Sequence, residues 1–178
     1  LVDCAHTGER TSLDAVDASS APVIISHANA RGVHDSRRNV SDELIRAVAV
    51  SGGVIGTVGF PPLLVWQGQP TLDGFIDDIA YKADLVGIDY VGLGIDYYLG
   101  QHPVEDDQAA RARYDSLLRA GLWHPDENPP PPYKFPEGIE TPKTLPNLTT
   151  RLVERGFAED DIRKILGGNW LRVFTEVW

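Results

Sequence analysis

The sequence has 178 residues, of which 42% are hydrophobic and 24% charged, as in globular domains and unlike disordered chains. Its 26 acidic and 16 basic side chains give a formal charge of −10, which argues against nucleic acid as the main partner. The single cysteine, Cys4, excludes an internal disulfide framework and a multi-cysteine zinc module, and we expect it to pack inside. No apolar run approaches the roughly 20 residues of a bilayer span, so no transmembrane segment is predicted.

The first hundred residues alternate short apolar runs with segments of helical periodicity. The apolar runs predict four strands, at residues 1–6, 22–27, 54–60 and 89–97. Helical spacing predicts helices at 11–19, from the cap Ser41 to the glycines at 52–53, and from the cap Thr71 to Val86. Such β-then-α alternation is typical of the α/β class, with a parallel sheet covered by helices, in one domain over residues 1–178.

Residues 101–146 have a different composition and interrupt this alternation. They hold nine of the 13 prolines, together with Trp123, Tyr133 and Phe135. A helix is predicted at 106–120, and three more follow this insert, at 145–156, 158–166 and 169–178. Because it carries aromatic anchors, we expect the insert to be an ordered excursion or lid. A poorly ordered surface loop is the alternative.

Three predicted strands end in polar side chains that suit catalysis. His6 and His27 are 21 residues apart, about one βα unit, and Asp96 follows the apolar run Gly92–Ile95. In a parallel α/β sheet the carboxyl ends of the strands face the active site. Two imidazoles on neighbouring strands would lie roughly 4.8 Å apart and could share one metal ion. Beside a metal-bound water, Asp96 could act as general base and acid.

Each of these residues also has a purely structural interpretation. A histidine at a strand end is often a hydrogen-bonded core residue, and Asp96 could cap the following loop. The loop after the second strand adds Arg31, Arg37 and Arg38 to the candidates. An arginine can bind a carboxylate through two parallel N–H bonds, whereas a surface ion pair is the alternative for each of the three.

Taken together, several segments resemble the membrane (renal) dipeptidase family of zinc peptidases, in order and in spacing. The segments cover nearly the whole chain and are Val2–His6, Pro22–Arg31, Arg37–Val40, Gly92–Asp96 and Gly167–Phe174. The stretch from Ser26-His27-Ala28-Asn29-Ala30-Arg31 to Arg37-Arg38-Asn39 is the most specific.

The resemblance implies a TIM-like (β/α)8 barrel that binds two zinc ions and hydrolyses dipeptides. It makes His6 and His27, at the ends of the fifth and sixth barrel strands, ligands of one zinc. Arg38 would contact the substrate carboxylate. Asp96, on the eighth strand, would bind the substrate amino group or carry the catalytic proton, while a bridging hydroxide attacks the peptide carbonyl.

The sequence departs from the family pattern in two ways, which affect its expected extent and its expected substrate preference. The family's His-x-Asp pair and bridging glutamate are absent, so the chain resembles the C-terminal half, about the last four βα units. Its partner would be the missing N-terminal half, and the chain alone is expected to be inactive. After Asp96 the sequence reads Tyr97-Tyr98-Leu99-Gly100 instead of Phe-Asp-Gly, so substrate preference is expected to differ.

A catalytically inactive barrel that binds amino acids or peptides is the alternative function. The sequence leaves the oligomeric state open, including a homo-oligomer. No signal peptide is visible at residues 1–5, and among the compartments the cytoplasm is favoured.

Overall fold

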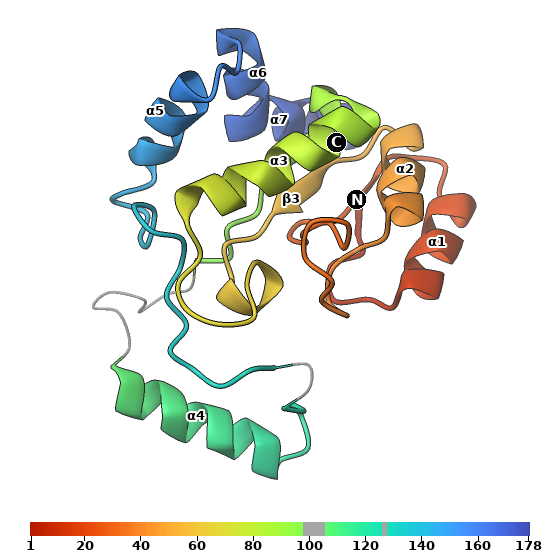
Figure 1. Ribbon diagram of the computed structural model, residues 1–178. Helices are drawn as coiled ribbons and strands as arrows, with labels where there is room; N and C mark the ends of the chain where they lie inside the picture. Colours follow the sequence, from red (N-terminus) through yellow and green to blue (C-terminus); the bar gives the residue numbers. More distant parts are fainter. Residues whose placement is uncertain (98–105, 126–127) are drawn as a thin grey trace.

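The computed structural model describes residues 1–97, 106–125 and 128–178 (Figure 1). The first five residues of the expected insert, the positions 98–100 that depart from the family pattern, and residues 126–127 lie outside the described residues.

Four short parallel strands follow one another in chain order. They are β1 (Val2–Asp3), β2 (Val23–Ile24), β3 (Ile55–Thr57) and β4 (Val91–Leu93). β1 pairs with β2 and β3 with β4, and a parallel bridge between Ile25 and Ile55 joins the two pairs. The predicted α/β class is confirmed. These four strands alone do not show a closed barrel.

The strand ladders are shorter than the apolar runs that predicted them. A Cβ at Gly94 or at Gly56 would lie 1.8 or 2.1 Å from the carbonyl oxygen of Ser26, so the strand ends approach so closely that only glycine fits. The fourth strand also begins later than predicted, because residues 88–90 form a 3-10 turn, η2 (Ile88–Tyr90). This turn follows Gly87, whose φ of 97° favours glycine.

The helices lie close to their predicted positions, and side chains cap two of them as expected. The elements besides the strands and η2 are α1 (Glu9–Ala18), α2 (Asp42–Val50), η1 (Pro61–Leu63), α3 (Leu72–Val86), α4 (Asp107–Arg119), α5 (Pro146–Glu154), α6 (Glu159–Arg163), the π-helical turn η3 (Lys164–Gly168) and α7 (Asn169–Val177). The Ser41 hydroxyl accepts from the Leu44 N–H at 3.2 Å, and that of Thr71 from the Gly74 N–H at 3.0 Å. These bonds satisfy N–H groups that a helix start leaves unpaired.

Helices pack on the strands through two main apolar clusters. In the first, Phe75 and Ile79 of α3 pack with Val91 of β4 and with Leu148 and Leu152 of α5. In the second, the buried face of α2 packs on β2; its residues are Leu44, Ile45 and Val48 against Val23. Burial of these faces fixes the strands, and therefore the side chains at their carboxyl ends.

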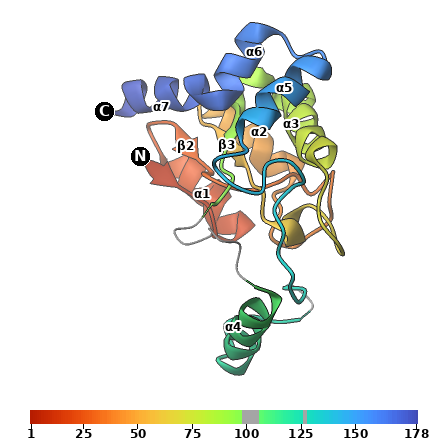
Figure 2. The same cartoon turned by 90° about the vertical axis from the view of Figure 1, so that its left-hand side faces the viewer.

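Helix α4 stands apart from this body. Figures 1 and 2 show it below the strands and outer helices, so the two views agree that it projects from the domain. It begins at Asp106, whose carboxylate accepts from the Ala109 N–H at 2.8 Å. Within the described ranges, the structure has no helix that is both long and apolar enough to span a membrane.

Candidate functional site

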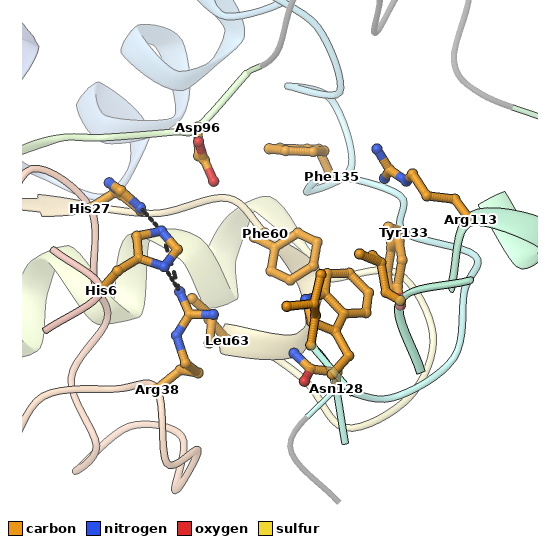
Figure 3. A pocket seen from close by; sticks show the side chains of 13 residues that line it. His6, His27, Arg38, Phe60, Leu63, Asp96, Arg113, Asn128, Tyr133 and Phe135 are labelled. Atoms are coloured by element: carbon orange, nitrogen blue, oxygen red, sulfur yellow. Dashed lines mark hydrogen bonds between the residues drawn. The ribbon is translucent and has the colours of Figure 1, made fainter. Parts of the chain in front are cut away.

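The two strand-end histidines face each other. Their strands are paired neighbours, as predicted, and the Nε2 atoms of His6 and His27 are 2.7 Å apart, with ring centroids at 4.8 Å. At this distance one ring donates a hydrogen and the other accepts it. The pair therefore presents two ring nitrogens that converge on one point in a cavity at the strand ends (Figure 3).

The backbone at the end of β2 is held by Asp3, on β1. The Asp3 Oδ1 accepts from the N–H groups of Ser26, at 2.9 Å, and of Ala5, at 3.0 Å. Burial is the largest influence and raises the pKa of Asp3. The hydrogen bonds from Ser26 and Ala5 together outweigh it, so the pKa lies below its usual value. An ionised Asp3 thus ties the two histidine-bearing strand ends together.

Ser26 also orients the imidazole of His27. Its Oγ lies 2.9 Å from the Nδ1 of His27, which leaves Nε2 directed at His6. A ring nitrogen held in this way by an outer group is typical of metal-ligating histidines, because the contact fixes both tautomer and orientation. Sequence reasoning did not identify Asp3 or Ser26 as site residues, since it considered only the last polar side chain of each strand.

His6 is suited to hold a cation as a neutral ligand. Partial burial, followed by electrostatic interactions with Arg38 and His27, lowers the pKa of His6, whereas Asp96 and Asp3 act in the opposite direction. A neutral imidazole keeps a lone pair for a metal. A tetrahedral ion about 2.1 Å from both Nε2 atoms would set them about 3.4 Å apart, so binding would need a small ring movement from 2.7 Å and removal of the proton that lies between the two rings. The pair therefore fits a shared metal ion.

Two histidines do not make a complete metal site. Among the described residues, no group of three or more histidine, cysteine, aspartate or glutamate side chains is arranged to hold a metal ion. Cys4 is buried, as expected, in the apolar cluster that contains the buried face of α2. It does not line the cavity of about 740 Å³ that the two histidines border. Further ligands would be water, substrate or groups beyond the described residues.

Of the three arginines after β2, only Arg38 lines the larger cavity. Its Nη2 donates to the Nδ1 of His6 at 2.9 Å, which places the hydrogen of the neutral His6 ring on Nε2 in this structure. Metal binding through Nε2 would require this hydrogen to move to Nδ1 and the contact with Arg38 to open. Arg31 instead pairs with Glu9 at 3.2 Å and donates to the Asn39 carbonyl at 2.9 Å, so the surface ion-pair interpretation applies to it. Arg37 lines a smaller adjoining cavity of about 250 Å³.

Asp96 is exposed and lines the same cavity as the two histidines. Figure 3 shows its carboxylate on the side of the cavity that carries His27 and His6. Within the described ranges, Asp96 and His6 are the two non-glycine residues with positive φ, at 69° and 61°. Such backbone conformations cost about 1–3 kcal/mol each and cluster at functional sites.

The other wall of this cavity of about 740 Å³ is mostly apolar and comes largely from the insert. Phe60, Tyr133 and Phe135 lie across from the strand-end residues in Figure 3. The remaining side chains of this wall, absent from the sequence-based site, are Leu63, Arg113, Leu117, Leu122, Trp123 and Asn128. The insert thus borders the mouth of the site.

A buried ion pair on α3 supports the loop that follows His27. Asp78 and Lys82 are fully buried and 2.6 Å apart. Asp78 accepts from the Ala30 N–H and the Thr57 hydroxyl, while Lys82 donates to the Ala28 carbonyl. Because all four contacts satisfy otherwise unpaired buried groups, the pair fixes this loop against β3.

The asparagines of the family-like motif are structural. Asn29 and Asn39 are buried, and the side-chain amide of each donates to the Leu63 carbonyl, at 3.1 and 3.0 Å. Asn29 also exchanges hydrogen bonds with the backbone of Val58. Together they hold η1, whose residue Leu63 forms part of the cavity wall.

Comparison with known proteins shows which sequences and folds this chain resembles. The sequence is 31% identical to the dipeptidase ataJ of Aspergillus terreus and 26% identical to dipeptidase 3 of Rattus norvegicus, each over 99% of this chain. An amidohydrolase structure from Pseudomonas aeruginosa is 32% identical over 99% of the chain, with a TM-score of 0.80. A metallopeptidase structure from Rhodobacter sphaeroides, with a phosphinate mimic of the dipeptide L-Ala-D-Ala, shares the fold at 22% identity and a TM-score of 0.76.

These relatives are longer than the chain. It covers 36% and 30% of the two dipeptidases, and 52% and 42% of the two solved structures. The sequence profile of the membrane dipeptidase family, peptidase family M19, matches residues 1–126 and 132–178. The match covers nearly all of the sequence, so the chain belongs to the membrane dipeptidase family of metallopeptidases, M19.

Proposed function

We propose that the full-length protein is a zinc-dependent dipeptidase and that this chain supplies about half of a (β/α)8 barrel, its last four βα units. The observation that carries the proposal is the convergence of His6, His27, Arg38 and Asp96 on one cavity at the strand ends. These four residues come from three strand ends and one loop, so the fold, and not proximity in sequence, brings them together.

Each residue has a distinct role in this proposal. His6 and His27 hold one zinc ion through their facing nitrogens, and the ion supplies Lewis acidity and lowers the pKa of a bound water. A second zinc ion, as in the family's complete barrel, would need ligands beyond the described residues. Arg38 binds the carboxylate end of a dipeptide. Asp96 holds the substrate amino group or transfers the proton.

Metal removal tests this proposal directly. The full-length protein is expected to contain zinc and to hydrolyse simple dipeptides. A chelator should abolish hydrolysis and added zinc should restore it, because the water nucleophile depends on the metal. Metal analysis and an assay for released amino acids measure both properties. A protein that binds dipeptides without cleaving them, with zinc fully loaded, would instead match the inactive-barrel alternative.

Substitution of Arg38 by lysine is expected to raise the KM for dipeptides more than it lowers kcat. Lysine keeps the positive charge but cannot form two parallel N–H bonds to a carboxylate. Steady-state kinetics of the full-length variant measure the split. Arg46→Lys, an exposed change on α2 outside the cavity, is the matched control. An unchanged KM in Arg38→Lys would show that Arg38 does not anchor the substrate.

A further inference from the structure

The apolar wall of the cavity contains a set of aromatic rings in mutual contact. Phe60 contacts Tyr133 at a centroid distance of 5.2 Å, and Trp123 contacts Tyr133 at 6.1 Å, edge to face. Tyr114, buried on α4, adds a second contact to Trp123 at 6.0 Å. These are favourable geometries for aromatic pairs, so the wall is held in place before any ligand arrives.

The polar end of Tyr133 is already occupied. Its hydroxyl donates to the Pro129 carbonyl at 2.8 Å. Burial raises the pKa of Tyr133, which therefore stays neutral at physiological pH. With its hydroxyl bonded to the insert's own backbone, Tyr133 offers the cavity mainly its ring.

Leu122 is an apolar side chain that the residues of this chain leave uncovered. It lines the cavity, yet 70% of its surface is exposed. Covering apolar area is favourable, because it removes that area from water. An apolar group bound in the cavity would gain this contact together with those to Trp123 and Phe60.

The volume of the cavity, and its continuity with the polar site, indicate which kind of molecule it binds. The cavity of about 740 Å³ lies in the range of small-molecule sites, about 300–1,000 Å³. The apolar wall shares this space with His6, His27, Arg38 and Asp96, so a molecule at the polar end extends toward the rings. A dipeptide of glycine or alanine would leave them uncovered.

We propose that this chamber, formed by Phe60, Leu122, Trp123 and Tyr133, binds a large apolar or aromatic side chain of the substrate. The inference rests on the proposed dipeptidase function and names its substrate class. The full-length protein is expected to prefer dipeptides that contain phenylalanine or leucine over those that contain only glycine and alanine.

The test compares Gly-Phe and Phe-Gly with Gly-Ala and Ala-Gly on the zinc-loaded, full-length protein. A single methylene group in a hydrophobic pocket already discriminates by about 10–200-fold, so kcat/KM should favour the phenylalanine peptide at least tenfold in one pair. Leu122→Ser and Trp123→Ala should each lower this preference at least threefold. Leu122 is largely exposed, so its replacement by serine leaves no cavity in the hydrophobic core.

Leu171→Ser is the matched control, because Leu171 on α7 is 67% exposed and lies outside the cavity. Calorimetric titration with the same peptides separates the two proposals. Tighter, Leu122-dependent binding of the phenylalanine peptide without hydrolysis supports the chamber and overturns the dipeptidase function. Hydrolysis with equal preference for all four peptides overturns the chamber alone. Preference for Gly-Asp over Gly-Phe, which Arg113 on the same cavity would favour, also overturns it.

Discussion

Replacement of His27 by alanine in the full-length protein is expected to abolish both zinc retention and dipeptide hydrolysis. Loss of a group that only orients a metal ligand costs about 10–100-fold in metal affinity, so loss of the ligand itself should exceed 100-fold. In this variant only His6, whose Nε2 lies 2.7 Å from that of His27 in the native protein, would remain of the two proposed histidine ligands. Zinc content after dialysis and kcat/KM for a dipeptide measure the two effects.

The control for this experiment is His124→Ala. His124 is exposed and lies outside the cavity, so its loss removes an imidazole without touching the proposed site. This variant should keep its zinc and its activity. A His27→Ala protein that retains stoichiometric zinc and full hydrolysis would show that the facing histidines are a structural hydrogen-bonded pair.

Substitution of Asp96 by asparagine is expected to lower kcat by about 10²–10⁴-fold, the usual contribution of a general acid or base. Asparagine tolerates the positive φ of 69° as aspartate does, so the change removes charge without new backbone strain. Zinc content should stay at the wild-type level, because the proposal gives Asp96 no role as a ligand. This separates its effect from that of His27→Ala.

Asp84→Asn serves as the matched control, since Asp84 is exposed on α3 and outside the cavity. Single-turnover kinetics distinguish a slowed chemical step from slowed product release. If Asp96→Asn keeps both the wild-type kcat and the wild-type KM for dipeptides, the carboxylate only shapes the loop after β4, as in its alternative interpretation as a cap.

Features that depend on neighbours in sequence could be predicted well. The caps Ser41 and Thr71 precede their helices by one residue, and the bonds that they form follow from local geometry. The pairing of His6 with His27 also followed from chain order, because consecutive βα units usually place their strands side by side.

Features that depend on distant segments could not be predicted. Asp78 and Lys82 show helical spacing, but nothing in it indicates that they bind the Ala28–Ala30 backbone. Leu122 looks like an ordinary exposed residue of a proline-rich stretch until the fold places it on the cavity wall. The strand lengths were overestimated for a similar reason, since apolar runs record burial and not hydrogen-bond pairing.

Shared zinc binding by His6 and His27 is tested most directly by a crystal structure of the full-length protein with zinc, in which anomalous scattering locates the metal. We expect one ring nitrogen of His6 and one of His27 to lie within about 2.3 Å of the same zinc ion, with Arg38 and Asp96 facing that ion across the cavity. Zinc bound in the protein without contact to either imidazole would contradict this expectation.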